Sequence, residues 1–327
     1  MRVTLLGTGC PVVDTHRYGP AALIEVSAED TANNNRVSAQ EPANNNQRSA
    51  GDTPEQNMPP SDGPAWLVDC GSGVTQRLLA HGRPGARLTG LLLTHLHSDH
   101  TVDLMQLLIS GWHQGRAAPL RVYGPRGTAA FLGAIRAAWQ PELNQRMAHE
   151  HRGPDGLELD ITEISGGWTL EEDGLRITST EVRHQPVPQA FGFRFDHTLT
   201  GTSAVISGDT AFSPELIALA QGCDLLVHET FVHWAFDAQR AHLPRETREN
   251  VRAYHTTGPE VGRVAAECGA GHLALTHFVP PRFDAARLLD DIRAHYGGPV
   301  SIGSDLMCLA VEGGGARLLR EGLGAPP

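Results

Sequence analysis

The sequence contains no lysine. Its 26 basic residues are all arginine and stand against 37 acidic residues, which gives a formal net charge of −11 over 327 residues. The absence of lysine excludes mechanisms that need a lysine amine, among them Schiff-base chemistry, pyridoxal phosphate anchoring, a Walker-type phosphate loop and the kinase ion pair. The acidic balance argues against a protein that coats nucleic acid non-specifically, because such a protein needs a basic face.

Cysteine is scarce, and long apolar runs are absent. The five cysteines are scattered and form no Cys-x-x-Cys pair: Cys10, Cys70, Cys223, Cys268 and Cys308. Such a set is typical of a reduced, intracellular protein and argues against a zinc ribbon. No apolar run approaches the roughly 20 residues of a membrane span, and the N-terminus is too short and glycine-broken for a signal peptide. We therefore expect a cytoplasmic protein with no membrane partner.

Segments typical of strands alternate with segments typical of helices in two similar halves of the chain. This alternation predicts one α/β domain over residues 1–327, with two sheets face to face and helices outside. The predicted elements include an apolar strand over 88–94 and a helix over 126–139. The segment Glu29–Gly63 lacks aromatic residues and contains a decayed 11-residue tandem repeat rich in asparagine. Because it cannot bury enough apolar surface to offset its ordering entropy, we expect a disordered insertion at a hairpin tip.

The segment that follows the apolar strand carries four potential metal ligands. It contains the pattern His-x-His-x-Asp-His, so the candidates are His95, His97, Asp99 and His100. A loop at a strand end can wrap such side chains around a cation, and imidazole together with carboxylate suits zinc. One such cluster cannot complete two metal sites, so further ligands are expected at other strand ends.

Three further candidates, His184, Asp209 and His277, each follow an apolar strand. Taken singly, each is weak evidence, because a histidine at a strand end is more often a hydrogen-bonded polar residue and an aspartate fits a turn equally well. Their order and placement together with the first cluster favour one shared site.

These motifs resemble the metallo-β-lactamase superfamily, and within it the ribonuclease Z and arylsulfatase-like branch. The His-x-His-x-Asp-His pattern is typical of the superfamily, while His-Glu-Thr-Phe at 228–231 and His-Thr-Thr at 255–257 indicate the branch. Matching segments run from Leu5–Gly9 to Leu275–Phe278, so the resemblance covers nearly the whole chain except Glu29–Gly63. It implies an αββα sandwich, in which two facing mixed sheets are covered by helices.

The resemblance also implies two zinc ions, although manganese or iron could replace them. It assigns His95, His97 and His184 to one ion, Asp99, His100 and His277 to the other, and Asp209 to a bridge between them. A hydroxide that bridges the two cations would be the nucleophile, oriented by Asp99. Asp69, in an Asp-Cys-Gly turn, is expected to orient the ligand loop from behind.

Glu229 and His255 match a proton-delivery pair of the ribonuclease Z branch. An imidazolium that protonates a poor alkoxide leaving group contributes roughly 10²–10⁴ in rate, and a carboxylate neighbour keeps it charged and oriented. This match favours a phosphodiesterase, including an endonuclease, with Asp99, Glu229 and His255 as catalytic residues. The alternative is that both lie on the surface without a role. Arg183 and Arg282 are candidate anion clamps or ordinary surface charges.

Departures from the branch argue against tRNA as a substrate. Ribonucleases Z that process tRNA carry a long flexible arm between the third and fourth ligand motifs, whereas a single hairpin fills the segment between His184 and Asp209. The negative net charge also gives tRNA little long-range attraction. We therefore expect a small-molecule or single-stranded nucleic-acid ester as substrate. A homodimer is also expected by likeness to related proteins.

Other functions on the same fold compete with phosphodiester hydrolysis. An arylsulfatase, a lactonase, a thioesterase or a β-lactamase would use the same metal centre. A catalytically idle scaffold that binds RNA or another partner would keep the fold alone. The presence of a suitable residue at all seven ligand positions argues against the idle scaffold.

Overall fold

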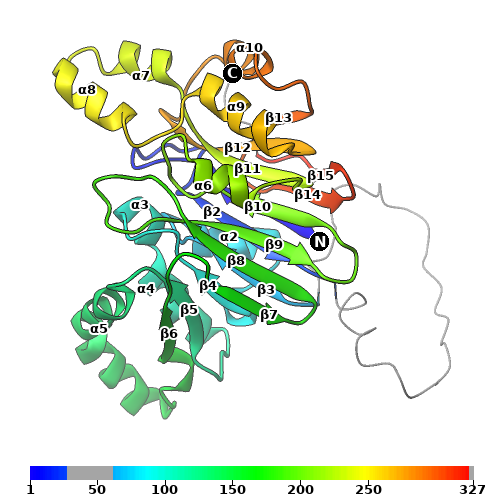
Figure 1. Ribbon diagram of the computed structural model, residues 1–327. Coiled ribbons are helices and arrows are strands. Elements are labelled where there is room, and N and C mark those ends of the chain that lie inside the picture. Colours follow the sequence, from blue (N-terminus) through cyan, green and yellow to red (C-terminus); the bar gives the residue numbers. More distant parts are fainter. Residues whose placement is uncertain (28–61, 324–327) are drawn as a thin grey trace, which may run out of the picture.

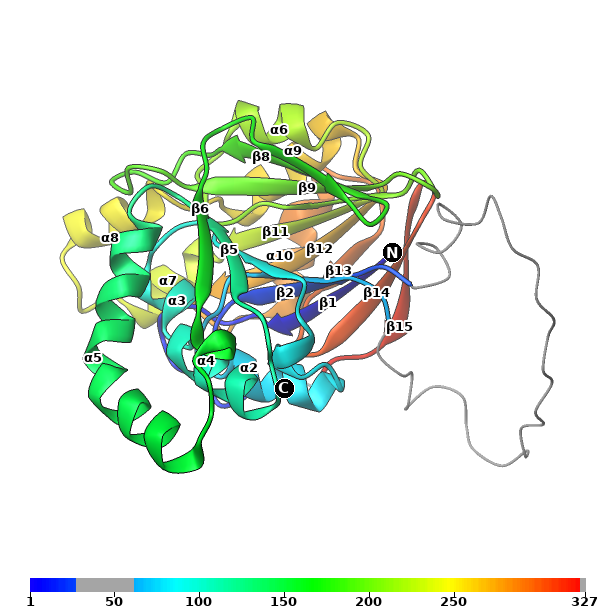
Figure 2. The same ribbon diagram turned by 90° about the horizontal axis from the view of Figure 1, so that it is seen from below.

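Two sheets stack face to face and carry helices on their outer surfaces (Figures 1 and 2). This computed structural model describes residues 1–27 and 62–323, so nearly all of the predicted insertion at Glu29–Gly63 lies outside the described residues. The arrangement confirms the predicted αββα sandwich. Among the described residues, no helix combines the length and apolar character that crossing a bilayer requires.

The first sheet has eight strands in the order β15-β14-β1-β2-β3-β4-β5-β6. Its strands are β1 (Arg2–Gly7), β2 (Ala21–Glu25), β3 (Ala65–Val68), β4 (Gly90–Leu92), β5 (Leu120–Gly124), β6 (Leu159–Glu163), β14 (Met307–Glu312) and β15 (Gly315–Arg320). Strands β3 to β6 are parallel, whereas the other neighbours pair antiparallel. The parallel half therefore directs the carboxyl ends of β3, β4 and β5 to one edge.

The second sheet has seven strands in the order β13-β12-β11-β10-β9-β8-β7. Its strands are β7 (Thr169–Glu172), β8 (Leu175–Glu181), β9 (Phe191–His197), β10 (Ser203–Ile206), β11 (Leu225–Phe231), β12 (His272–Val279) and β13 (Val300–Ile302). Strands β10 to β13 are parallel. Strands β13 and β15, each at the edge of its sheet, have no separate counterparts among the predicted elements.

Helices cover both outer faces. Buried side chains of α2 (Val74–His81) and α4 (Leu104–His113) pack under the first sheet, beside α5 (Thr128–Glu150). Helices α6 (Pro214–Leu219), α9 (Gly258–Cys268) and α10 (Ala285–Arg293) pack over the second sheet. The remaining helices are α3 (Ser98–Thr101), α7 (His233–Gln239) and α8 (Arg245–Arg252), which lie at the left end of the sandwich in Figure 1.

Helix α5 differs from its prediction. The predicted helix ends at 139, before Pro141, whereas the observed helix continues through this proline to Glu150. A proline inside a helix removes the hydrogen bond to the carbonyl four residues earlier. That carbonyl belongs to Ala137, which is exposed, so water can satisfy it and the helix continues.

The core between the sheets is formed by apolar residues from both. Trp66 and Ile24 from the first sheet and Phe193, Phe195 and Leu225 from the second belong to one cluster and are fully buried. These side chains fix how the two sheets, and hence the loops at their ends, face each other.

We expect Phe193→Ala to lower the free energy of unfolding by about 3–5 kcal/mol, because it removes a fully buried ring and leaves a cavity. Urea unfolding followed by circular dichroism measures the change. The control Leu318→Ala, on an exposed side chain of β15, should change the same quantity by less than about 0.5 kcal/mol. Equal effects of the two substitutions would contradict this view of the core.

Candidate metal centre

The predicted ligands converge at one end of the sandwich. His95, His97, Asp99 and His100 follow β4 of the first sheet, the last two in α3, whereas His184 follows β8, Asp209 follows β10 and His277 lies within β12 of the second sheet. Each comes at or after the end of a strand whose carboxyl end points to this edge. The site is therefore built from both sheets.

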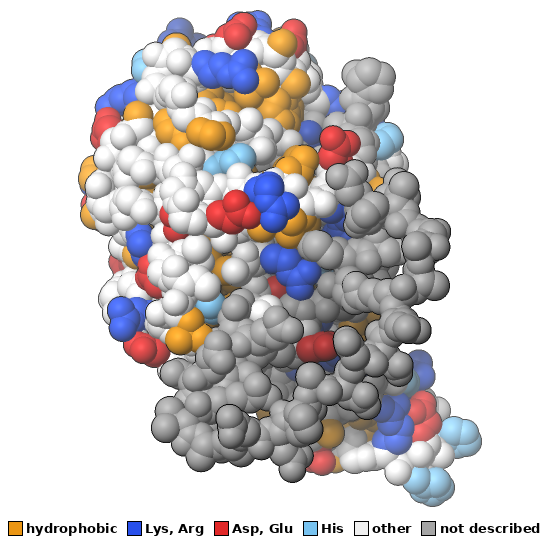
Figure 3. Space-filling view, turned by 90° about the vertical axis from the view of Figure 1, so that its right-hand side faces the viewer, with side chains coloured by type: hydrophobic (Ala, Val, Ile, Leu, Met, Phe, Trp, Pro, Cys, Tyr) orange, Lys and Arg blue, Asp and Glu red, His pale blue; other side chains and the backbone are white. Residues whose placement is uncertain are grey.

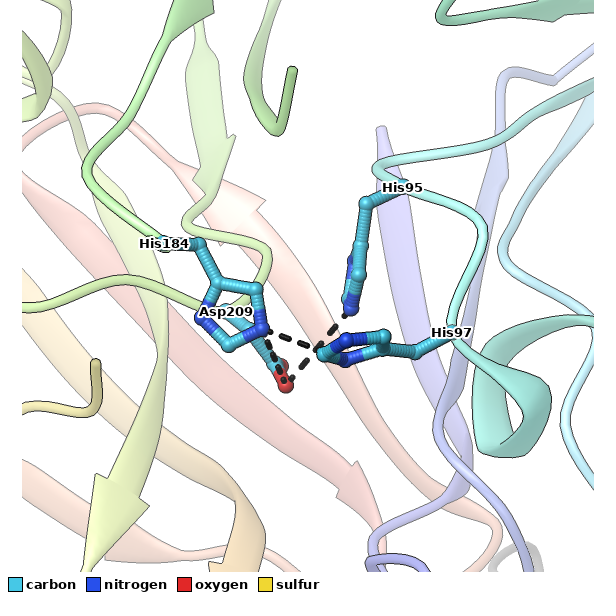
Figure 4. Close-up of side chains that lie close together, drawn as sticks. All are labelled: His95, His97, His184 and Asp209. Carbon is cyan, nitrogen blue, oxygen red and sulfur yellow. Dashed lines mark hydrogen bonds and ion pairs between the residues drawn. The ribbon is translucent and has the colours of Figure 1, made fainter. Parts of the chain in front are cut away.

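The first group contains His95, His97, His184 and Asp209, whose ligand atoms all lie within 4.8 Å of one another. Figure 4 shows the three imidazoles and the carboxylate pointing toward a common centre. The Nε2 atoms of His95 and His184 each lie 3.9 Å from Oδ2 of Asp209. Nδ1 of His97 lies 3.2 Å from Nε2 of His184.

The second group contains Asp99, His100 and His277 and shares Asp209 with the first. The Nε2 atoms of His100 and His277 each lie 3.3 Å from the same Oδ2 of Asp209. Oδ2 of Asp99 lies 3.2 Å from Nε2 of His277 and 3.6 Å from Nε2 of His100. One carboxylate oxygen of Asp209 therefore stands between both groups.

The donor atoms of the site suit divalent cations. Three fully buried atoms that face it, Nε2 of His95, Nε2 of His100 and Oδ1 of Asp209, have no hydrogen-bond partner among the described residues. A buried polar atom without a partner costs free energy, so such groups are normally paired or bound to a metal. Imidazole nitrogens and carboxylate oxygens are ligands for zinc and for manganese or iron. The residues therefore fit the metal centre that the sequence predicts.

Burial and charge set the protonation of these side chains. Burial lowers the pKa of His95 well below its usual value, and it also lowers the pKa values of His97 and His184, which favours the neutral imidazole that binds metal. Burial would raise the pKa of Asp209, but the positive charges of His277 and His100 outweigh it and hold this pKa well below the usual range. Asp209 is therefore an anion, as a bridging ligand must be. Burial would lower the pKa values of His100 and His277, but Asp209 and its neighbouring carboxylates raise them, that of His277 to about 8, so these two rings must lose a proton to bind a cation.

Hydrogen bonds behind the site orient the imidazoles. Nδ1 of His100 donates to Oδ2 of Asp69 at 2.8 Å, and Nδ1 of His184 donates to the carbonyl of Tyr254 at 2.8 Å. Thr94 donates its amide and hydroxyl to Asp69 and lies 2.9 Å from Nδ1 of His95. With Nδ1 occupied, Nε2 of each of these three rings is left for a cation. Asp69 thus contacts the ligand loop as the sequence predicts.

Removing the charge of Asp69 tests this support. We expect Asp69→Asn to weaken metal affinity by about 10–100-fold, because the amide accepts poorly from His100 and no longer polarises its ring. Competition with a fluorescent zinc chelator measures the affinity. The fold should persist, because asparagine also tolerates the left-handed backbone of residue 69, where φ is 61°.

Local backbone irregularities place two of the ligands. The pairing of β11 with β12 passes from Glu229–Thr276 to Thr230–Phe278, so His277 is an extra residue in a bulge, with φ of 46°. A bulge re-aims a side chain, here toward Asp209. Gly208 has φ of 59°, and a Cβ there would lie 2.5 Å from the carbonyl oxygen of Phe191, so only glycine fits before Asp209.

Glu229 and His255 form a buried pair beside the ligands. Nδ1 of His255 donates to Oε1 of Glu229 at 2.8 Å, and the amides of Thr210 and Thr256 donate to the same oxygen at 3.0 and 3.3 Å. A ligand atom of His255 also lies within 4.8 Å of ligand atoms of Asp209 and His277. The surface interpretation of the pair is therefore wrong. Because of this proximity, His255 is also a candidate metal ligand together with Asp209 and His277, a role that the sequence does not predict.

The two arginines predicted as candidate anion clamps form ion pairs with acidic side chains instead. Arg183 makes two hydrogen bonds to Glu215, and Arg282 pairs with Asp14 at 2.9 Å, both on exposed guanidinium groups. Sequence reasoning also missed the carbonyl of Tyr254, since any residue type offers a carbonyl and no side-chain pattern marks it.

Several known proteins are similar to this chain in sequence or in fold. Residues 66–278 match the β-lactamase superfamily domain. A protein of Mycobacterium marinum named ribonuclease Z is 32% identical over 313 residues, which cover 94% of this chain and 97% of that relative. Among solved structures, the metallo-β-lactamase fold protein YhfI from Bacillus subtilis has a TM-score of 0.64 at 20% identity and covers 94% of this chain and 98% of its own. The short form of human tRNase Z has a TM-score of 0.62 at 20% identity, with 95% and 99% covered.

The chain therefore belongs to the metallo-β-lactamase superfamily, in its ribonuclease Z branch. It is a metal-dependent hydrolase of ester bonds.

Proposed function

We propose that this hydrolase cleaves phosphodiesters with the help of two divalent cations, for which zinc is the first candidate. His95, His97 and His184 would hold one cation, Asp99, His100 and His277 the other, and Asp209 both. The observation that carries the proposal is the position of Oδ2 of Asp209, within 3.3–3.9 Å of four imidazole Nε2 atoms from the two groups. When bound, such a pair of cations supplies a water of lowered pKa and a clamp for phosphate oxygens.

The Glu229–His255 pair points to the bond that is cleaved. With Nδ1 donating to Glu229, His255 has Nε2 available for a proton that it can give to a leaving oxygen. Three hydrogen bonds converge on Oε1 of Glu229, which hold the carboxylate in place and so orient the ring. Alkoxide leaving groups need that proton whereas a thiolate does not, which argues against thioesters. A lactone or a β-lactam would also use the proton, so the likeness to relatives named ribonuclease Z is what favours phosphodiesters over these two. Asp99, at the edge of the second ligand group, would orient the attacking water.

A substrate panel combined with metal analysis tests the proposal. We expect purified protein to contain about two transition-metal ions per chain, and to hydrolyse bis(4-nitrophenyl) phosphate in preference to an aryl sulfate, a lactone and a cephalosporin. A chelator should remove the activity, and zinc or manganese should restore it. Less than one bound metal per chain, or faster cleavage of the lactone or cephalosporin, would overturn the proposal.

RNA is a second candidate substrate, because the relatives at 32–33% identity are named ribonuclease Z. We propose small or single-stranded esters over folded tRNA. Residues 191–206 between the ligands form only the hairpin of β9 and β10. The net charge of −11 gives a folded polyanion little attraction. At the end of the sandwich away from α3, shown in Figure 3, arginine and acidic side chains are interspersed among the described residues. Cleavage of a precursor tRNA at a kcat/KM above that of a single-stranded oligonucleotide would reverse this order.

A further inference from the structure

A pocket of about 530 Å³ opens directly beside the candidate metal centre. Asp99 of α3 is part of its wall, and the rest comes from the loop at residues 10–19, from Ser72, and from Ser98 and Val102 at the two ends of α3. Pro11, Val13, Tyr18 and Val102 give it an apolar lining. Val13 and Val102 are 87% and 62% exposed. Large apolar side chains at such exposure beside a reactive centre mark a place where a ligand can bury them.

A second hollow, of about 540 Å³, adjoins the first. The two share Ser98 and Val102 in their linings, so they meet at these residues and extend from Asp99 past α3 to α5. The second hollow is lined by Leu96, Ile109, Phe131 and Trp139 among others, and none of the described residues that line it is charged. We call the two hollows together the apolar trough.

The trough offers no free cation to a substrate. Arg17 is the one positively charged residue among the described residues that line it, and its guanidinium donates to the hydroxyl of Thr8 and to the carbonyls of Gly303 and Pro281. Asp14 lines the same pocket with a carboxylate, whose pKa is lowered by hydrogen bonds that outweigh the effect of burial. Asp14 is in turn paired with Arg282 at 2.9 Å. A phosphate or carboxylate beyond the reacting centre would therefore find no unpaired cation among the described residues of the trough, whereas an uncharged apolar group would lose only water.

We propose that the apolar trough binds a bulky uncharged substituent of the substrate, an alkyl chain or an aryl group esterified to the reacting phosphate. This inference rests on the proposed function and narrows its substrate class. The expected substrate is a phosphoester with a large apolar group and not a polynucleotide, which carries a negative charge on every nucleotide. Because Asp99 lines the trough, we infer that its occupant is a group attached to the reacting phosphate. A separate protein partner would not need to lie against Asp99.

A series of n-alkylphosphonic acids, from ethyl to decyl, tests the proposal. The phosphonate binds the metal centre and the tail reaches into the trough, whichever ester group leaves. Burial of a methylene corresponds to a factor of at most about four in affinity, so in an open trough we expect the dissociation constant to fall about two- to fourfold per methylene. Calorimetry on the metal-loaded protein measures it directly, and the heat-capacity change should become more negative with tail length.

Three variants complete the experiment. Val102→Asp and Trp139→Ser should flatten the dependence on tail length, whereas Leu199→Asp, on an exposed side chain in the turn between β9 and β10, should keep it. Metal content of each variant controls for damage to the neighbouring ligands. A dissociation constant that does not depend on tail length overturns the trough. The proposal is also overturned if Val102→Asp changes the oligomeric state measured by light scattering but leaves the dependence of the dissociation constant on tail length unchanged. The trough would then be an interface between two copies of the chain.

The failure of this inference differs from that of the proposed function. If diesters are not hydrolysed but the calorimetric series still depends on tail length, the trough stands and the reaction type is wrong. If bis(4-nitrophenyl) phosphate is hydrolysed and the series is flat, the reaction type stands and the trough is wrong.

Discussion

Replacing Asp209 by asparagine is expected to lower kcat/KM for bis(4-nitrophenyl) phosphate by on the order of a thousandfold or more. The substitution keeps the size of the side chain but removes the negative charge whose Oδ2 lies between the two ligand groups. Two cations placed close together repel each other, and a bridging anion offsets that repulsion. We therefore also expect the metal content to fall from about two ions per chain to one or fewer, as measured by elemental analysis.

The matched control is Asp196→Asn on β9 of the same sheet, where the carboxylate pairs with Arg194 at the surface. It should leave both metal content and kcat/KM within about twofold, as expected for a surface substitution. Full metal occupancy in the Asp209 variant would show that this residue does not bridge, and the assignment of the two ligand groups would have to be revised.

Replacing His255 by alanine is expected to slow diesters with alkoxide leaving groups by about 10²–10⁴-fold. The same substitution should slow bis(4-nitrophenyl) phosphate much less, because nitrophenolate is stable without protonation. Steady-state kinetics on a dinucleotide and on the nitrophenyl ester compare the two effects. His149→Ala, on an exposed histidine of α5, should affect neither substrate.

Metal content decides between two roles for His255. A ligand atom of this ring lies close enough to those of Asp209 and His277 to join them around an ion, although its Nδ1 is bonded to Glu229. A proton donor leaves metal content unchanged when it is removed, whereas a ligand does not. Loss of one ion in His255→Ala, with equal loss on both substrates, would contradict the donor role. Glu229→Gln should then reproduce a weaker form of whichever defect is found.

Much of the fold and the candidate ligands could be predicted because the signals are local. The apolar strands occur in the predicted order, and each ligand candidate lies in or shortly after the last residues of one. Parallel strands bring their carboxyl ends to the same edge of a sheet, so ligand candidates late in β10 and β12 or just after them, such as Asp209 and His277, are predicted to lie close together.

The remaining features depend on contacts between segments far apart in sequence. The hydrogen bond from His184 to the carbonyl of Tyr254 and the wall that the N-terminal loop gives to the pocket beside Asp99 arise from tertiary packing. The bulge at His277 is a two-strand property that its own sequence does not reveal. Helix α5 passes Pro141 because the affected turn faces water, and exposure is likewise a tertiary property.

The origin of the candidate ligands in both sheets has a consequence for how the molecule melts. His95 and His100 come from the segment that follows β4 of one sheet, whereas Asp209 and His277 come from the second sheet, so ions held among them would link the two layers at one end. Ions that bind the folded chain alone add their binding free energy to its resistance to heat. Stripping the metal should therefore lower the melting temperature and let the layers part at that end first, which amide hydrogen exchange would reveal as faster labelling of the strand ends there.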